Sequence, residues 1–445
     1  MNENNDIKRA IENFSTNQPR YVKSENYYKG NHTLTFATEK FKNAFGSLFR
    51  EFADNLCPPV VDAVKDKLTI TGFQVEEGET DSATKAWKIW QNNRMGKRAG
   101  EIHKEAIKNG DSYAIVWTDP AGKVTIYPQK AATCTVFYDA ETPGKILYAA
   151  KCWQRIDKKL RLNLYYSDRI EKYISRSVGA MLNEKDLIPF TDDGEAIITN
   201  PFDVVPVFHF ANNSDIGSFG CSELDQAMPI QDALNKSVLD MLVAAEFASY
   251  RQRYATGVDV EYDADGKPKA PFMAGVERLW VTENPEVKFG DFEATELKQF
   301  LNVQQSFRIE MATVTGTPLY YFALAEAKYP SGEALSKSET RFISKVKDRQ
   351  ESFGQVWEDL MSFALLLEGN AKASQLFVEW TDPAALSQKE LLETLVLKKA
   401  VGVPEEQLWI EAGYGEKDIE RMKELKKATA EAVVNAFNAG ETDEE

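Results

Sequence analysis

The chain has little of the residue chemistry on which most enzymes depend. Its 445 residues include only three histidines, His32, His103 and His209, so imidazole-based acid–base or metal chemistry has few candidates. The four cysteines form no CxxC pair, which argues against a zinc site and against a disulfide framework. Phosphate-loop, GxGxxG, HExxH and GxSxG motifs are also missing. We therefore expect no enzymatic activity, no cofactor and no metal, and a structural role for each histidine.

Long hydrophobic runs are absent as well. No apolar stretch approaches the roughly 20 residues that a membrane-spanning helix needs, and the N-terminus shows no basic-then-apolar signal pattern. We expect a cytoplasmic protein with reduced thiols and no membrane partner. With 43% apolar and 27% charged residues, the chain is long enough for about two to four ordered domains.

Basic residues are in the minority. The chain has 53 lysines and arginines against 69 acidic residues, which gives a net charge of -16. This sign disfavours a firm grip on nucleic acid, because such binding depends on neutralising phosphates. An acidic surface instead repels a phosphate backbone, and it would let DNA slide past without sticking.

Two helical patterns around a strand-rich insert are the most informative feature that is present. The first helix is expected over Pro229 to Gln252 and the second over Thr295 to Val314, each with one apolar stripe. Strands are expected in the insert at Val258 to Tyr262 and at Val276 to Val281. After a glycine- and proline-containing loop, a third helix of about 36 residues is expected to reach Leu367.

The regions before and after these helices show different patterns of expected secondary structure. Hairpin-length turns join most strand patterns between Met1 and Cys221, which predicts a mixed α/β region with a mainly antiparallel sheet. A strand is expected at Leu376 to Trp380, followed by a helical region from Ser387 to Asn438.

Several residue groups allow two interpretations. The carboxylate and lysine pattern of a metal-dependent nuclease can be matched by Asp259, Glu286 and Lys288. Such spacings also arise by chance in an acidic chain. Trp87 and Trp90 could stack on bases, but core packing explains them better. For the aromatic cluster at 320–322, which lies in the expected loop, both readings stay open.

Short segments in a fixed order carry a resemblance to a known family. They are Tyr28–His32, Val60–Asp62, Gly72–Phe73, Trp87–Asn92, Gly110–Tyr113, Val116–Trp117, Tyr138–Asp139, Val205–Val207, Gly220–Leu224, Gln231–Asn235, Gly316–Pro318, Ser331–Leu335 and Trp380–Pro383. In this order they resemble the portal proteins of tailed double-stranded DNA bacteriophages. The resemblance covers nearly the whole chain.

The resemblance implies an α+β, mainly helical fold with portal-protein architecture. It divides the chain into an α/β wing, a two-helix stem, a small β clip and a helical crown. In chain order these parts are the wing at 1–224, stem helix 1 at 225–252, the clip at 253–294, stem helix 2 at 295–315, a tunnel loop at 316–331, the long helix and strand of the wing at 332–386, and the crown with an acidic tail at 387–445.

The function that the resemblance implies is a ring-shaped channel at one capsid vertex, through which viral DNA is packaged and ejected. The resemblance implies a ring of twelve copies of the chain. The other expected partners are the terminase large subunit, head-completion or adaptor proteins, major capsid and scaffolding proteins, and double-stranded DNA. The expected location is the virion, and the host cytoplasm during assembly. The alternatives are the nuclease above and a head–tail adaptor without a tunnel.

Two sets of residues are the expected sites in this reading. Those of the DNA-channel loop are Thr317, Tyr320, Tyr321, Lys328 and Tyr329. Those of the clip that would contact terminase or connector proteins are Arg253, Lys267, Lys269, Arg278 and Lys288.

Overall fold

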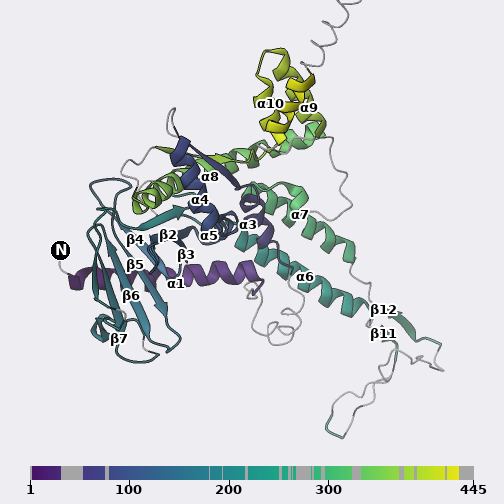
Figure 1. Ribbon diagram of the computed structural model, residues 1–445. Coiled ribbons are helices and arrows are strands. Elements are labelled where there is room, and N and C mark those ends of the chain that lie inside the picture. Colours follow the sequence, from purple (N-terminus) through teal and green to yellow (C-terminus); the bar gives the residue numbers. More distant parts are fainter. Residues whose placement is uncertain are drawn as a thin grey trace, which may run out of the picture. The chain divides into compact units, whose positions relative to one another are not determined.

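The protein forms two compact units in the computed structural model (Figure 1). The first comprises Met1–Lys328 with Ser338–Pro383, and the second Tyr329–Lys337 with Ala384–Glu445. The structure describes residues 3–31, 54–75, 80–179, 181–192, 194–215, 219–249, 253–258, 262, 264–266, 282, 285–291, 296–322, 332–369, 375–384, 388–415 and 418–429.

The first unit begins with helices that follow the sequence signals closely. They are α1 Glu3–Lys29, α3 Cys57–Lys65, α4 Thr80–Asn92 and α5 Met95–Asn109. Pro58 and Pro59 lie in the first turn of α3, where a missing N–H removes no helical hydrogen bond. Helix α5 ends at Gly110, whose φ of +92° is readily available only to glycine. Local residue signals therefore account for the start of α3 and the end of α5.

Apart from β11 and β12, described below, the described strands of this unit form three sheets. A three-stranded sheet has the order β10-β2-β3, a six-stranded sheet contains β4 to β9, and β1 pairs with β13. Their bounds are β1 Ile70–Val75, β2 Asp111–Thr118, β3 Val124–Lys130, β4 Cys134–Tyr138, β5 Ile146–Gln154, β6 Leu160–Tyr166, β7 Arg169–Ser175, β8 Leu187–Pro189, β9 Ile197–Thr199, β10 Val207–Ala211 and β13 Leu376–Trp380. A single 3₁₀ turn, η1 Glu184–Asp186, precedes β8. Every pair formed by these strands is antiparallel, which confirms the expectation from the short turns.

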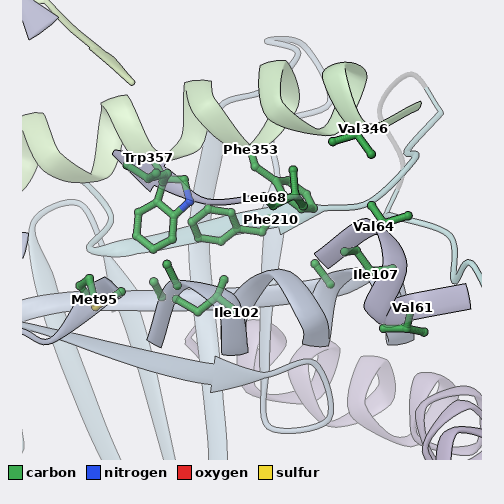
Figure 2. Close-up of a cluster of buried hydrophobic side chains, with 14 of the residues drawn as sticks. Val61, Val64, Leu68, Met95, Ile102, Ile107, Phe210, Val346, Phe353 and Trp357 are labelled. Carbon is green, nitrogen blue, oxygen red and sulfur yellow. The ribbon is translucent and has the colours of Figure 1, made fainter. Parts of the chain in front are cut away.

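The largest core lies where helix α8, Gly332–Leu367, packs on α5 and β10. In Figure 2, Phe353 and Trp357 of α8 point toward Phe210 of β10, and Ile102 of α5 approaches from the opposite side. The Trp357 ring lies 4.7 Å from that of Phe210 and 4.9 Å from that of Trp90. A fully buried aromatic cluster of this size supplies much of the hydrophobic stabilisation of the unit.

The six-stranded sheet is packed on both faces. One face packs on α1 through a cluster that includes Ile7, Ala10 and Leu162. The other face contributes Val136 to a cluster shared with Tyr113 of β2. Figure 1 shows α1 running across this sheet. Each face of the sheet therefore contributes to a buried cluster within the chain.

The tryptophan pair of α4 belongs to the core. The rings of Trp87 and Trp90 stack at 6.2 Å, and Trp90 is buried against Phe73 of β1. The core interpretation is therefore confirmed, and base stacking by Trp90 is excluded by its burial.

Buried His103 has the structural role that the sequence analysis expected. Its Nε2 accepts a hydrogen bond of 2.9 Å from the indole N–H of Trp357, and its ring stacks on Phe353. Burial lowers the pKa of His103 to about 3. The imidazole is therefore neutral at physiological pH and serves as a hydrogen-bond acceptor.

This burial predicts a pH dependence of stability. In the unfolded chain, histidine has an ordinary pKa of about 6.5, so the unfolded state binds a proton first as the pH falls. Stability from neutral His103 is therefore present above about pH 6.5 and is lost between about pH 6.5 and 3. We expect urea unfolding to show a loss of about 2 kcal/mol from this group between pH 7.5 and 5.

The variant His103→Gln tests the assignment, because its amide oxygen can still accept from the indole but does not titrate. The free energy of unfolding of the variant should fall less between pH 7.5 and 5 than that of the parent chain. Equal pH slopes in the two proteins would show that His103 is not the titrating group.

Two helices and two short strands form the central hairpin of the chain. They are α6 Ala227–Ser249, β11 Arg253–Thr256, β12 Lys288–Asp291 and α7 Leu297–Thr315. Both helices are confirmed. Most of the strand expected at Val258 to Tyr262 lies outside the described residues, and Tyr262 itself forms a β-bridge. The pairing of β11 with β12 was not expected from the sequence. The strand expected at 276–281 lies outside the described residues.

The remaining elements agree with the sequence patterns. Helix α8 has 36 residues, and β13 matches its expected bounds. The second unit contains α9 Gln388–Ala400, α10 Glu405–Glu411 and a helical stretch at 418–429. Within the described part of the chain, no helix is both long and apolar enough to cross a membrane.

Candidate channel and docking elements

The α6–α7 hairpin is the candidate functional element. The two helices pack side by side along their length, and Gln304 of α7 lies 3.5 Å from the sulfur of Met241 on α6 (Figure 1). The buried positions of α7 centre on Met311, with Phe300 and Phe307 half-buried. Together with half-buried Gln304, these positions are three or four residues apart, as expected for a helix packed along one face.

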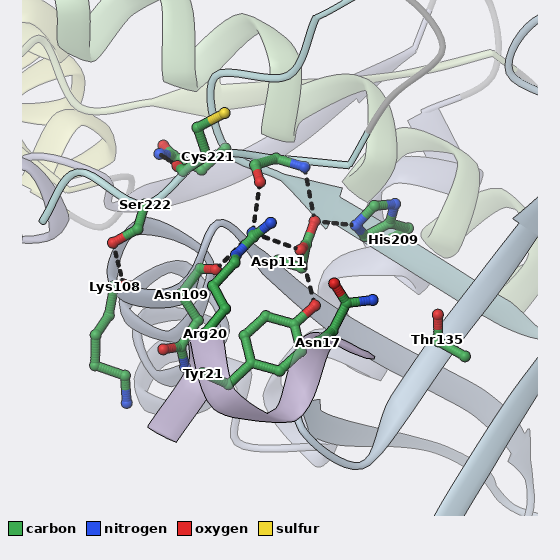
Figure 3. A network of polar contacts seen from close by, with 12 residues as sticks. Asn17, Arg20, Tyr21, Lys108, Asn109, Asp111, Thr135, His209, Cys221 and Ser222 are labelled. Atoms are coloured by element: carbon green, nitrogen blue, oxygen red, sulfur yellow. Dashed lines mark hydrogen bonds and ion pairs between the residues drawn. The ribbon is translucent and has the colours of Figure 1, made fainter. Parts of the chain in front are cut away.

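A buried carboxylate anchors the segment that leads into α6 (Figure 3). Asp111, the first residue of β2, accepts hydrogen bonds from Arg20 at 3.1 Å, from the Tyr21 hydroxyl at 3.1 Å and from the backbone N–H of Gly220 at 2.8 Å. Its other contact is His209 Nε2 at 2.9 Å. One side chain thus links α1, β2, β10 and the segment before α6.

His209 contacts a different side chain through each of its two ring nitrogens. With the Nε2 hydrogen directed at Asp111, Nδ1 is left to accept from the Tyr138 hydroxyl at 2.7 Å. Burial, and then the nearby Asp111 charge, raise the pKa of Tyr138 to about 12. The tyrosine therefore remains a proton donor, and the second histidine that the structure describes also has a structural role.

Two glycines allow this anchor to form. The Arg20 guanidinium donates to the carbonyl of Gly220 at 2.6 Å and to that of Asn109 at 2.9 Å. A Cβ atom on Gly220 would clash with the carbonyl oxygen of Gly110, and one on Gly110 would meet both Arg20 and Gly220. The segments Gly110–Tyr113 and Gly220–Leu224, which carried part of the resemblance, are therefore spatial neighbours that approach through glycine.

Ion pairs fix the same segment to α8. Glu223 contacts Lys345 at 2.6 Å and Arg349 at 3.0 Å, and Arg349 also donates to Asn212 at 2.6 Å. Burial alone would raise the pKa of Glu223, but the charges and hydrogen bonds of Lys345 and Arg349 lower it. The carboxylate is ionised, and the start of α6 is held from two sides.

Buried polar side chains continue this anchoring into α6 itself. Gln231 accepts from the N–H of Leu56 at 2.8 Å, and Asp232 accepts from the Tyr27 hydroxyl at 2.8 Å. From α7, Arg308 pairs with Asp54. The base of the helix hairpin is therefore joined to α1 and α3 by directional bonds, which fix its orientation more strictly than apolar contacts do.

The described residues of the expected DNA-channel loop pack into this chain. Thr317 is only 2% exposed, so its side chain cannot reach a ligand in this arrangement. Tyr320 and Tyr321 lie in a 3₁₀ turn, η2 Leu319–Tyr321, and the Tyr320 hydroxyl donates to Glu339 of α8. Burial raises the pKa of both tyrosines.

Two further residues expected in this loop, Lys328 and Tyr329, lie outside the described part of the chain. The neighbouring Phe322 is 3% exposed and belongs to the main core, so core packing is the correct interpretation for that member of the aromatic cluster.

The expected clip residues are only partly described. Lys288 is exposed at the start of β12, and the backbone of Arg253 begins β11. Lys267, Lys269 and Arg278 lie outside the described residues.

The alternative nuclease site finds no support in the part of the chain that the structure describes. Glu286 and Lys288 are exposed, Asp259 lies outside that part, and no group of described histidine, cysteine, aspartate and glutamate residues could hold a metal ion.

Sequence reasoning missed the residues that hold the hairpin in place. Asp111, Arg20 and Glu223 belong to no periodic pattern, and their partners are about 90 to 130 residues away in the chain. The only available signal was the pair of glycine-containing segments that begin at Gly110 and Gly220. Their spatial proximity is a property of the folded chain.

The fold defines an α+β, mainly helical protein whose distinctive element is a helix hairpin held by buried polar bonds. The family model for "Phage portal protein, SPP1 Gp6-like" matches residues 7–433. The chain belongs to this family of portal proteins.

Individual relatives agree with this assignment. The portal protein of Mycobacterium phage L5 is 26% identical over 381 residues, which cover 82% of this chain and 76% of the relative. The portal protein of Mycobacterium phage D29 is 24% identical over 385 residues, with the same coverage.

Solved structures with a similar chain include two necks of gene transfer agent (GTA) particles. The neck of the native particle, computed with C12 symmetry, gives a TM-score of 0.47, and that of the empty particle, computed with C6 symmetry, gives 0.49. In each comparison the sequences are 11% identical, and the matched region covers 86% of this chain and 95% of the chain in the solved structure. At these scores the likeness carries no argument about assembly.

Proposed function

We propose that copies of this portal protein form a ring-shaped channel at one capsid vertex, through which viral DNA is packaged and ejected. The match to the portal family over residues 7–433 is the observation that carries this proposal. In the proposal the protein is a structural part of the virion, has no catalytic activity of its own, and is present in the host cytoplasm during assembly.

Apolar side chains on α7 support contacts between copies. Although α7 already packs on α6, Leu301 remains 55% exposed, and Leu297 lies exposed one turn before it on the same side of the helix. Isolated exposed leucines are common, but an apolar strip on a helix with one face already buried suits a second partner helix. A neighbouring copy would supply that helix in a ring.

The charge of the chain suits a conduit for DNA. Twelve copies with a charge of -16 each would carry about -192, and a field of that sign discourages adhesion of the phosphate backbone. Local cations such as Lys328 could then touch phosphates without a firm grip.

The division into parts is also a proposal. Residues 1–224 and 332–386 would form the wing, 225–252 and 295–315 the stem, 253–294 the clip, 316–331 the tunnel loop, and 387–445 the crown and acidic tail. The buried Thr317 and the half-buried Tyr320 and Tyr321 would hold the loop on α8, and Lys328 and Tyr329 would meet DNA.

The proposed partners follow from these parts. The clip would contact the terminase large subunit and later the head-completion proteins. The residues proposed for these contacts are Arg253, Lys267, Lys269, Arg278 and Lys288. Major capsid and scaffolding proteins would surround the ring. A head–tail adaptor without a tunnel is the competing function, and it predicts no closed ring of this chain.

Introducing a charge into the α7 strip tests the ring directly. We expect the parent protein to sediment as a ring of several hundred kilodaltons, with a central hole in negative-stain images. The substitution Leu301→Asp places a carboxylate in the proposed apolar contact, so rings should be reduced at least ten-fold at equal protein concentration.

The matched control is Ser306→Asp, which adds the same charge at an exposed position on the opposite side of α7. The control should retain rings. Rings formed equally by both variants would remove the α7 strip from the interface, and a parent protein that stays monomeric at high concentration would contradict the channel itself.

A further inference from the structure

Three exposed aliphatic side chains lie at adjacent turns at one end of the six-stranded sheet. Ile156 occupies the β5–β6 turn and is fully exposed. Val178 and Met181 occupy the β7–β8 connection and are 60% and 89% exposed. We refer to Ile156, Val178 and Met181 together as the apolar tip.

A backbone hydrogen bond joins the two turns that carry the apolar tip. The N–H of Gly179 donates to the carbonyl of Lys158 at 3.1 Å, which places Val178 beside the turn of Ile156. Each turn is also closed internally: Lys158 N–H donates to Arg155 at 3.0 Å, and Arg176 N–H donates to Asp186 at 2.8 Å. The apolar tip therefore projects from an ordered part of the sheet.

The fold itself does not require these aliphatic residues. None of the three belongs to a hydrophobic cluster of the described residues, and both faces of the sheet are already packed. Turns favour glycine, asparagine, aspartate and serine, which satisfy backbone groups and are well hydrated. Three aliphatic side chains gathered at such a position mark a surface that is covered by another molecule.

Unpaired cations surround the apolar tip. Lys158, Arg176 and Lys185 are exposed and form no ion pair with any other described residue. Among the nearby carboxylates, Asp157 lies 3.7 Å from Arg155 and Asp186 accepts from Ser177 at 3.1 Å, while Glu184 lies in the same β7–β8 connection. In a chain with a net charge of -16, this positive rim is a local exception that favours an acidic partner.

We propose that the apolar tip docks into an apolar pocket, edged by carboxylates, on another protein of the particle. This inference rests on the proposed function, because it places the partner among the proteins that enclose the ring. Aliphatic side chains offer no ring to stack on bases, which disfavours nucleic acid. The strongly acidic chain would be repelled by an anionic membrane, which disfavours a lipid surface.

The experiment co-expresses the chain with the major capsid and scaffolding proteins encoded by the same virus, and counts copies of the chain per particle. One variant carries Ile156→Ser, Val178→Ser and Met181→Ser together, and a second carries Lys158→Glu, Arg176→Glu and Lys185→Glu. The control is Ile197→Ser, which removes an exposed aliphatic side chain from β9 of the same sheet. Negative-stain images first establish that each variant forms the same rings as the parent.

We expect both triple variants to form rings but to enter particles at least ten-fold less often than the parent and the control. Rings that enter particles normally in both variants would overturn the docking proposal and leave the channel intact. Absence of rings in the parent would overturn the channel instead. Binding of the parent to anionic vesicles or to double-stranded DNA that is lost in the serine variant would also overturn the proposal of a protein partner.

Discussion

Replacing Asp111 with alanine is expected to lower the free energy of unfolding by about 3–5 kcal/mol. The carboxylate accepts bonds from Arg20, Tyr21 and the backbone of Gly220, and it contacts His209. Alanine would leave buried donors without an acceptor, and each such loss carries the full desolvation cost of the group. Urea unfolding followed by circular dichroism measures the change.

The control for this prediction is Asp192→Ala, which removes an exposed carboxylate from a turn of the same unit. Its unfolding free energy should stay within about 0.5 kcal/mol of the parent value. A similarly small change for Asp111→Ala would show that the network contributes little and that apolar packing alone positions the start of α6.

The variant Trp357→Ala is expected to be at least as damaging. The indole is fully buried among Trp90, Phe210 and Phe353, and its N–H donates to His103. Truncating a buried tryptophan costs about 3–5 kcal/mol through lost apolar contact and the cavity that remains. The variant also leaves Nε2 of His103 without its hydrogen-bond donor, which lowers the free energy of unfolding further. The urea midpoint should therefore fall sharply.

Two companion variants separate the contributions at this site. Trp357→Phe keeps much of the ring volume but removes the hydrogen bond, so it should recover a large part of the loss. Trp409→Ala, at a half-buried position in the second unit, should leave the unfolding of the first unit unchanged. Equal effects of Trp357→Ala and Trp409→Ala would contradict a central role for the α8 core.

The periodic elements of the fold could be predicted from sequence. Helices α6, α7 and α8 carry apolar residues at helical spacing, Pro229 lies in the first turn of α6, and Gly316 and Gly369 follow the ends of α7 and α8, which are local properties. Short turns likewise predicted antiparallel strands. Within the insert, the pairing of β11 with β12 was not predicted from the sequence.

Long-range partners could not be predicted in the same way. β1 and β13 pair although about 300 residues separate Ile70 from Trp380, and no spacing in the sequence indicates this contact. Thr317 was expected in the DNA-channel loop, and its side chain is buried. Its burial depends on residues from elsewhere in the chain.

The sequence by itself determined the acidic charge, the helix–insert–helix order and the membership of the portal family. These follow from residue types and from their order along the chain. Only the tertiary structure decided that Asp111 joins Arg20, His209 and Gly220 at the start of α6, and that Ile156 and Val178 are exposed on adjacent turns. The reason is physical, because hydrogen bonds and burial depend on distances in space, which sequence separation does not give.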